Sequence, residues 1–368
     1  MSLSTLAGCS GGLFRQESAP PIVANEAPVA PSDTRRVDSP RRFPAEDLMG
    51  RTPGRPDVSL IGMAASDLRQ HTTLVDGADF DPTIDPSGDS LAFASTRYSR
   101  NSHLYIKSVR GATITQITDG PANDAQPCFD QTGTRLAFAS DRAGNWDIWL
   151  VDVSGRNPIQ ISNDPAQEMH PTFSPDGRHI AYCRMDSGRG VSTIWVADVE
   201  NPGVKRLIGE GMFPTWSPKG DRIAYQRARA RGSRWFSIWT VQLNENEALY
   251  PTEVANRPDS ALITPAWSPE GTQLAFSMVR QEGIEGETTA DIGIVDADGR
   301  GFQRVTTGES ANHGPAWGAD GRIYFSSRTA EAETIWSVKP FRPPVFENAP
   351  SATTSNTRRA ALAEETEE

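Results

Sequence analysis

Acidic and polar residues cluster just before a proline that recurs along the chain. They are Asp79, Asp81, Asp124, Gln126, Glu168, His170, Asn312 and the adjacent His313. The matching positions elsewhere are apolar or small: Gly211, Phe213, Leu262, Thr264 and Gly314. If the fold brings these repeated positions to one place, their carboxylates could hold a cation or a cationic peptide segment. Alternatively, they form a solvated acidic rim without a ligand.

A second candidate site is a basic loop with adjoining aromatic residues. Its members are Arg227, Arg229, Arg231, Arg234 and Trp235. Four like charges in a chain of net charge −11 could dock an acidic partner or a headgroup. The alternative is a solvated loop with one arginine paired to a nearby carboxylate. The arginines Arg97, Arg142, Arg229 and Arg280 recur with a fixed spacing, so structural pairing is the role that we predict for them.

Catalytic signatures are absent from the sequence. It has no G-x-S-x-G nucleophile elbow, no H-E-x-x-H, no P-loop and no G-x-G-x-x-G. The chain has five histidines. We therefore expect no cofactor, no metal and no enzymatic activity. The other hypothesis is a propeller lyase or hydrolase that uses the carboxylates above with His170 or His313.

The elements that must position these residues come from a repeated phrase, Pro171-Thr172-Phe173-Ser174-Pro175-Asp176-Gly177, which precedes the apolar run 179–182. Five further copies begin at Pro82, Pro127, Pro214, Pro265 and Pro315. A period of about 45 residues is typical of a propeller or a similar array. We interpret the proline as the first residue of a strand, and Ser-Pro-Asp-Gly as the turn that leads into the next strand.

Two further strands follow in each repeat, for example 147–150 and 158–162. Four antiparallel strands make one propeller blade, so six copies predict an all-β, six-bladed β-propeller over residues 66–340. The last copy lacks a fourth strand, and residues 69–74 resemble one. We expect this N-terminal strand to complete the last blade, which would remove two exposed sheet edges. Most tryptophans recur with the repeat and are predicted to lie in the core.

The phrase P-x-W-S-P-D-G-x-x-I-A-F, followed by an Ile-Trp strand, resembles the WD40-like (PD40) repeat of TolB-type propellers. The resemblance covers about residues 69–340, and we expect a tether to stand where that family has an α/β domain before the propeller. The resemblance implies a bacterial protein in the periplasm or cell envelope that acts by binding a protein or peptide. We predict a monomeric propeller, and the acidic charge argues against a nucleic-acid partner.

The ends of the chain differ from the repeats. Leu6-Ala7-Gly8-Cys9 resembles the lipobox of bacterial lipoproteins, so residues 1–9 are interpreted as a truncated lipoprotein signal and Cys9 as the lipidated residue. A chance match in a disordered segment is the alternative. Residues 10–65, rich in Pro and Ala, are predicted to be a disordered tether, and residues 341–368 a disordered acidic tail. Cys128 and Cys183 are expected to be buried thiols.

Overall fold

The computed structural model describes residues 65–74, 76–186, 188, 190–229, 235–244, 247–282, 287–307, 310–329 and 332–341. Every regular element in these residues is a β-strand. Within them, no helix is long and apolar enough to cross a membrane. The predictions for Cys9, residues 1–9, the tether and the acidic tail concern residues outside this described part, as do those for Arg231 and Arg234.

The strands form antiparallel four-stranded units, and we call each of these units a blade. The first three blades consist of β2 (Asp79–Ile84), β3 (Ser90–Ser95), β4 (His103–Ser108), β5 (Ile114–Gln116); β6 (Asp124–Phe129), β7 (Arg135–Ser140), β8 (Asp147–Asp152), β9 (Ile159–Gln160); and β10 (Gln167–Phe173), β11 (His179–Asp186), β12 (Val191–Asp198), β13 (Lys205–Glu210).

The remaining blades follow the same order, except at the end of the ring. They consist of β14 (Met212–Trp216), β15 (Arg222–Ala228), β16 (Phe236–Leu243), β17 (Ala248–Ala255); β18 (Ala261–Trp267), β19 (Gln273–Glu282), β20 (Glu287–Asp296), β21 (Gln303–Arg304); and β22 (Ala311–Trp317), β23 (Ile323–Arg328), β24 (Glu333–Pro340), β1 (Ala65–Gln70).

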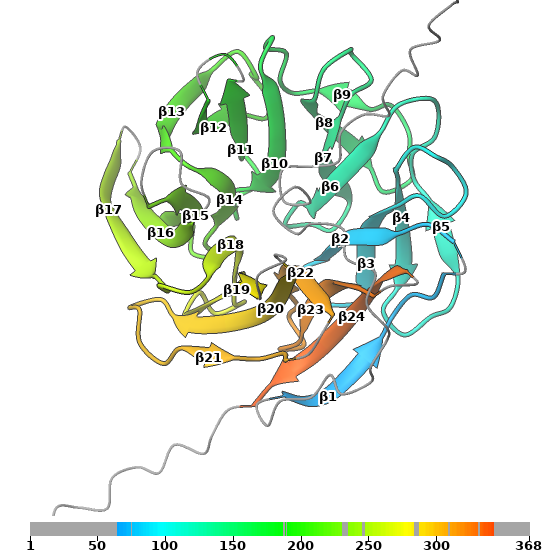
Figure 1. Cartoon of the computed structure of the whole chain (residues 1–368). Helices are drawn as coiled ribbons and strands as arrows, with labels where there is room; N and C mark the ends of the chain where they lie inside the picture. Colours follow the sequence, from blue (N-terminus) through cyan, green and yellow to red (C-terminus); the bar gives the residue numbers. More distant parts are fainter. Residues whose placement is uncertain are drawn as a thin grey trace, which may run out of the picture. The chain divides into compact units, whose positions relative to one another are not determined.

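The blades surround a central axis, and the first strand of each blade, β2, β6, β10, β14, β18 and β22, lies nearest to it (Figure 1). Four blades are separate sheets, whereas the last two form one eight-stranded sheet. A single parallel pair, Ala290 with Ala311, joins those two blades. The predicted all-β propeller is therefore confirmed, and the pairing differs from six separate sheets at this one junction.

The turn in the repeated phrase explains why each inner strand reverses. In the third blade the amide of Gly177 donates to the carbonyl of Ser174 (2.9 Å), and the Ser174 hydroxyl accepts from the amide of His179 (2.9 Å). Gly177 has φ +69°, a conformation that suits glycine. The inner strand is thereby fixed to the buried second strand that follows it.

The core lies between neighbouring blades, not within one blade. One cluster joins Leu104 of the first blade to Phe129, Leu136 and Val151 of the second. Tryptophans such as Trp216, Trp239 and Trp317 pack against clusters of this kind, as predicted. Burial of apolar surface therefore holds the blades side by side.

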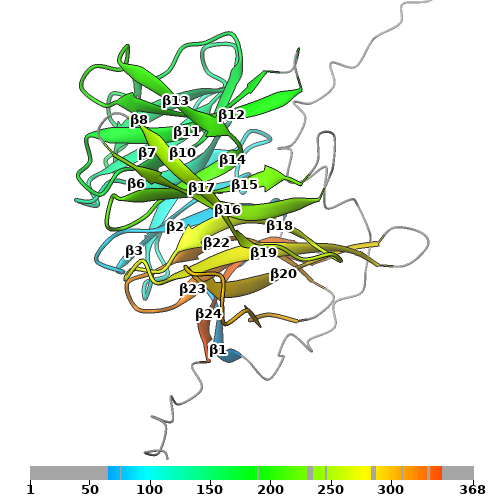
Figure 2. The same cartoon turned by 90° about the vertical axis from the view of Figure 1, so that its left-hand side faces the viewer.

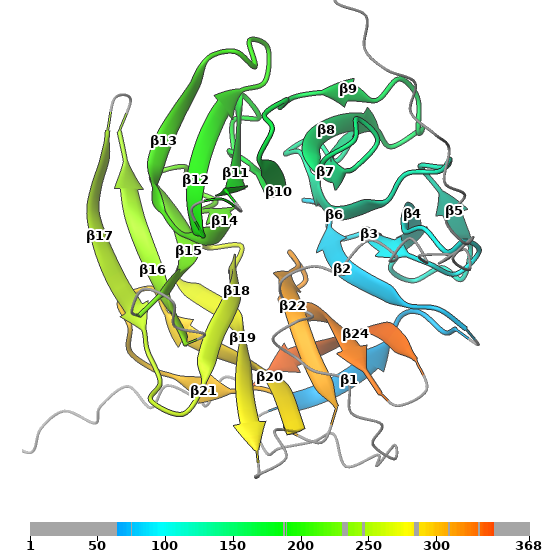
Figure 3. The ribbon, with the colours of Figure 1, turned by 45° about the horizontal axis from the view of Figure 1, so that its top comes forward.

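The N-terminal strand closes the ring. β1 pairs antiparallel with β24, for example Gln70 with Trp336, and the two strands lie side by side in Figures 2 and 3. The predicted closing strand is confirmed, although the strand runs over Ala65–Gln70 and the residues after it continue as a loop.

The loop after β1 reproduces a hydrogen bond that other blades make just after their outer strands. The hydroxyls of Thr118, Ser162 and Thr306 accept from third-strand amides in the first, second and fifth blades (2.8–3.0 Å). In the last blade the Thr72 hydroxyl accepts from the amide of Ile335 at 3.0 Å. The start of the described chain thus takes the place of a fourth strand in the register of the repeat.

Candidate functional site: a central funnel

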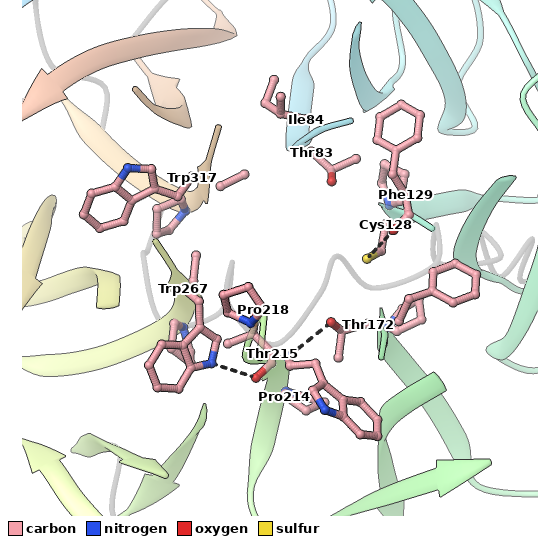
Figure 4. A pocket seen from close by; sticks show the side chains of 18 of the residues that line it. Thr83, Ile84, Cys128, Phe129, Thr172, Pro214, Thr215, Pro218, Trp267 and Trp317 are labelled. Carbon is pink, nitrogen blue, oxygen red and sulfur yellow. Dashed lines mark hydrogen bonds between the residues drawn. The ribbon is translucent and has the colours of Figure 1, made fainter. Parts of the chain in front are cut away.

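A cavity of about 490 Å³ lies on the axis and is lined by all six inner strands and the turns that follow them. We call it the funnel. Its wall carries the residue that follows each recurring proline: Thr83, Cys128, Thr172, Thr215, Ala266 and Ala316. Figure 4 shows Thr83, Cys128, Thr172 and Thr215 around the open centre, with Trp267 and Trp317 set back between blades. The residues after the prolines thus supply short uncharged side chains, while Asp81, Asp85, Asp130 and His170 also line the cavity.

The residue before each proline adopts a left-handed backbone conformation. The φ angles lie between +52° and +61° at Asp81, Gln126, His170, Phe213, Thr264 and Gly314. Each inner strand shifts its register at this point, which marks a β-bulge. Because proline has no N–H group, the bulge leaves no unpaired donor at the second residue. The prediction that these prolines begin a strand was wrong, since Pro82 is the fourth residue of β2.

Side chains from the preceding blade hold several of these strained residues. The Gln126 Oε1 atom accepts from the amide of His170 (2.9 Å), and Gln226 Oε1 accepts from the amide of Thr264 (2.9 Å). The Ser277 hydroxyl accepts from the amide of Gly314 at 3.0 Å. Non-glycine residues in this conformation each carry a strain cost, so such contacts between neighbouring blades help to maintain the ring.

His170 lines the funnel, and the side chains that contact its ring are uncharged. Its Nε2 atom is 3.1 Å from Gln126 Nε2, and its ring centroid is 3.6 Å from that of Phe213. Burial lowers the pKa of His170 to about 3. The imidazole is therefore neutral at neutral pH.

The predicted site residues separate into two groups. Asp81, Gln126 and His170 line the funnel, whereas Asp79, Asp124, Glu168 and Asn312 are fully buried and do not. The placement of this second group at the channel mouth was wrong. In a regular strand, residues two apart share a face, but each inner strand continues into the bulge at this point.

Buried arginine pairs occupy two of the misplaced carboxylates. Arg97 donates to Asp79 and Arg142 donates to Asp124, each at 2.7 Å. Burial opposes ionisation of Asp124, but His103, Ser140 and Arg142 together lower its pKa. Arg280 likewise contacts Asp291 at 2.8 Å, so the predicted structural pairing of the recurrent arginines is confirmed for these three.

Glu168 differs from the other buried carboxyls. Its two oxygens have no hydrogen-bond partner within the described residues. Arg184, its partner in the strand register, contacts Asp164 at 2.8 Å instead. Burial raises the pKa of Glu168 by more than Ser162 and Lys205 lower it, and the charge of Asp164 adds to the rise.

His313 forms a separate polar group with residues of the last blade. Its Nε2 atom is 2.8 Å from Glu333, which also contacts Arg328 at 3.1 Å. Burial opposes ionisation of Glu333, yet His313 and Arg328 hold its pKa below the usual value. His313 does not line the funnel, so the structure does not bring it together with His170. In the described residues, no three His, Cys, Asp or Glu side chains form a metal-binding group.

The described part of the basic loop makes contacts inside the propeller. Arg227 lies 5.3 Å from the Trp239 ring centroid and 3.9 Å from Glu210. Arg229 donates to the carbonyls of Arg257 and Ser260, and Trp235 packs against a buried cluster. These contacts give three of the five predicted loop residues a structural role.

The two cysteines in the described residues are free thiols. Cys183 is buried, and burial raises its pKa to about 12. Cys128 is only half-buried because it faces the funnel, which corrects the prediction of full burial. The sequence reasoning missed Cys128 and its threonine equivalents as wall residues. Each of them is followed by an apolar residue that packs against a core cluster, and alternation from that residue could have placed them there.

Two family models match this chain. The Tricorn protease N-terminal β-propeller domain matches residues 143–343, which is more than half of the sequence, and the TolB β-propeller domain matches residues 49–208. The chain belongs to the Tricorn N-terminal β-propeller family and is a TolB-like propeller.

Individual proteins resemble this TolB-like propeller over parts of their length. A TolB homologue from Chlorobium luteolum is 28% identical over 102 residues, which cover 28% of this chain and 22% of that protein. The crystal structure of TolB from Acinetobacter baumannii has a TM-score of 0.56 at 23% identity, over 66% of this chain and 57% of that one. The chain thus spans less than two thirds of either relative.

An enzyme shares the fold as well. Oligogalacturonate lyase from Vibrio parahaemolyticus has a TM-score of 0.51 at 11% identity, over 76% of this chain and 96% of that one. At such identities the likeness to solved structures concerns the fold alone. The TolB-like propeller therefore has both TolB proteins and an enzyme among its structural neighbours.

Proposed function

We propose that this chain is a non-enzymatic scaffold of the bacterial cell envelope that binds an extended protein or peptide segment in the funnel. The observation that carries the proposal is the funnel wall. Its short side chains and proline rings leave about 490 Å³ of space on the axis. This volume lies within the range of sites that enclose small ligands. A narrow peptide segment fits such a wall better than a folded surface does.

The chemistry around the funnel supports binding over catalysis. A general base works best when its pKa lies near the working pH, and His170 titrates at about 3. Asp79 and Asp124 are held in buried arginine pairs. The alternative is a lyase or hydrolase that uses channel carboxylates with a histidine. The contacts described for His170 are with Gln126 and Phe213, and neither is a carboxylate.

The location rests on resemblance. TolB-like repeats and the Leu6-Ala7-Gly8-Cys9 sequence favour a periplasmic protein tethered to a membrane by a lipidated Cys9. The partner is then a protein or peptide of the same compartment, bound by a single propeller.

A site-specific photo-crosslinker tests this function. We would place it at Thr172 on the funnel wall and, as a control, at Tyr250, which is 70% exposed on the outer strand β17. We expect a discrete crosslinked species from the Thr172 probe in intact cells and none of the same mass from Tyr250. Equal labelling at both positions, or none at Thr172, would contradict the proposal.

A matched pair of substitutions in the fourth blade sharpens the test. Thr215→Trp fills the funnel, whereas Thr252→Trp adds the same bulk on exposed β17. The crosslink from Thr172 should disappear with the first change and persist with the second. A turnover activity that His170→Asn abolishes would instead establish the enzyme alternative.

A further inference from the structure

A second cavity, of about 420 Å³, lies where the ring closes, and we call it the seam cavity. Its lining comes from the closing segment, the first blade and the last blade. The charged members are Asp67, Arg69, Arg110, Asp320, Arg322 and Lys339. Four cations face two carboxylates, so the cavity is positive in a chain of net charge −11.

The two carboxylates of the seam cavity are already engaged. Asp67 accepts from Arg69 Nε at 2.9 Å and from Arg322 at 2.7 Å. Asp320 accepts from the Tyr324 hydroxyl and the amide of Arg322, each at 3.0 Å. Neither Arg110 nor Lys339 forms an ion pair within the described residues. Two exposed cations therefore remain available at this edge.

Lys339 departs from the repeat in the sign of its charge. In the second, third and fifth blades the corresponding third-strand residue is an aspartate, Asp152, Asp198 or Asp296. Those aspartates lie opposite Arg135, His179 and Gln273. In the last blade the pairing ends at Ile323 with Val338, and Arg322 and Lys339 are the next residues on the two chain segments. The last blade therefore has two cations where those blades have an aspartate with a basic or polar partner. Like charges at neighbouring positions repel each other.

We propose that the seam cavity binds an oxyanion of the phosphate class through Arg110 and Lys339, with Arg69 at its edge. Arginine and lysine both bind phosphate oxygens, arginine with a planar fork of donors. The anion would supply a counter-charge to Lys339, whose neighbour Arg322 already pairs with Asp67. It would also link the closing segment, the first blade and the last blade. The phosphate group comes either from a free ion or from a lipid headgroup.

Titration calorimetry with inorganic phosphate and with pyrophosphate, at constant ionic strength, tests the soluble source. We expect saturable binding that weakens by roughly tenfold or more in Arg110→Gln and Lys339→Gln, because each loses one charged contact. Arg300→Gln removes a cation that is 87% exposed on the fifth blade and should bind as the parent does.

Flotation with phosphatidylglycerol vesicles, against phosphatidylcholine vesicles, tests the lipid source. Loss of phosphatidylglycerol binding in Lys339→Gln, but not in Arg300→Gln, would assign the headgroup. Lys339→Asp restores the aspartate of the other blades, so it should abolish binding while the melting temperature without anion stays equal or rises. The proposal fails if neither source binds, or if Lys339→Asp binds like the parent protein.

Discussion

The second and third blades carry a carboxyl at the same repeat position, and the two carboxyls lie in opposite electrostatic states. Asp124 and Glu168 are both fully buried at the start of an inner strand. Asp124 has Arg142 at 2.7 Å, and its pKa is lowered. Glu168 has no hydrogen-bond partner in the described part of the chain, and its pKa is raised. Burial opposes ionisation of both groups. Around Asp124 the contacts with His103, Ser140 and Arg142 outweigh it, whereas around Glu168 those with Ser162 and Lys205 do not.

The position of the arginine explains this difference. Asp124 pairs with Ser140, and Arg142 stands two residues beyond it, where its side chain turns back and lies 5.1 Å from the Trp149 ring centroid. Opposite Glu168 stands Arg184 itself, whose guanidinium reaches Asp164. The arginine of β11 stands two positions nearer to the start of that strand than its equivalent in β7. Within the described residues, the buried Glu168 therefore has no ion-pair partner. The repeat sets where a carboxyl lies, and the neighbouring strand sets its charge.

The largest expected effect is the loss of the arginine pair in the second blade. Asp124→Ala leaves Arg142 partly buried without its counterion, and we expect the free energy of unfolding to fall by about 3–5 kcal/mol. Urea unfolding at neutral pH measures this change. The Asp124→Ala, Arg142→Ala double variant should lose less than the sum of the two single variants. Strict additivity would show that the pair is not coupled.

The third blade should respond in the opposite direction. Glu168→Gln keeps the shape of the side chain and removes a charge that has no counterion. We therefore expect equal or higher stability at neutral pH. A folded-state pKa above the unfolded value means that the contribution of Glu168 is complete below about pH 4.5 and is lost as pH rises through the folded pKa. Thermal melts of parent and variant should thus diverge as pH rises above 4.5. A destabilised variant at neutral pH would indicate a bonded, ionised Glu168.

The fold was predictable because the same sequence motif occurs six times along the chain. The proline, the aromatic and the Ser-Pro-Asp-Gly turn give the period, and Thr72 lies in the closing segment at the position that Thr118 and Thr306 hold in other blades. The closing strand could be recognised for the same reason. Local chemistry and ring closure agree in this sequence, so pattern alone was sufficient for the architecture.

The site was predictable only in part because of the bulge. Strict alternation puts Asp79 and Asp81 on one face, whereas in the structure only Asp81 lines the funnel. A proline inside a strand is itself an indication of a bulge, and the sequence offered that signal at Pro82. The counterion of each carboxyl depends on long side chains from other strands. Arg184, which bonds Asp164 and not Glu168, shows that such a choice is not visible in spacing.

The smallest expected effect concerns His170, which shares the third blade with Glu168. Its folded pKa of about 3 lies below the unfolded value of 6.5. The stability that the neutral ring contributes is therefore present above pH 6.5 and declines as pH falls toward 3. His170→Asn removes this titration and keeps a residue that tolerates φ +57°. We expect little change at pH 7.5 and a flatter stability curve between pH 6.5 and 3. His71 should retain part of the acid sensitivity, because burial lowers its pKa to about 4. An unchanged slope in the variant would mean that the pKa of His170 is the same in the folded and unfolded states, and that the third blade is less sealed from solvent than its buried Glu168 indicates.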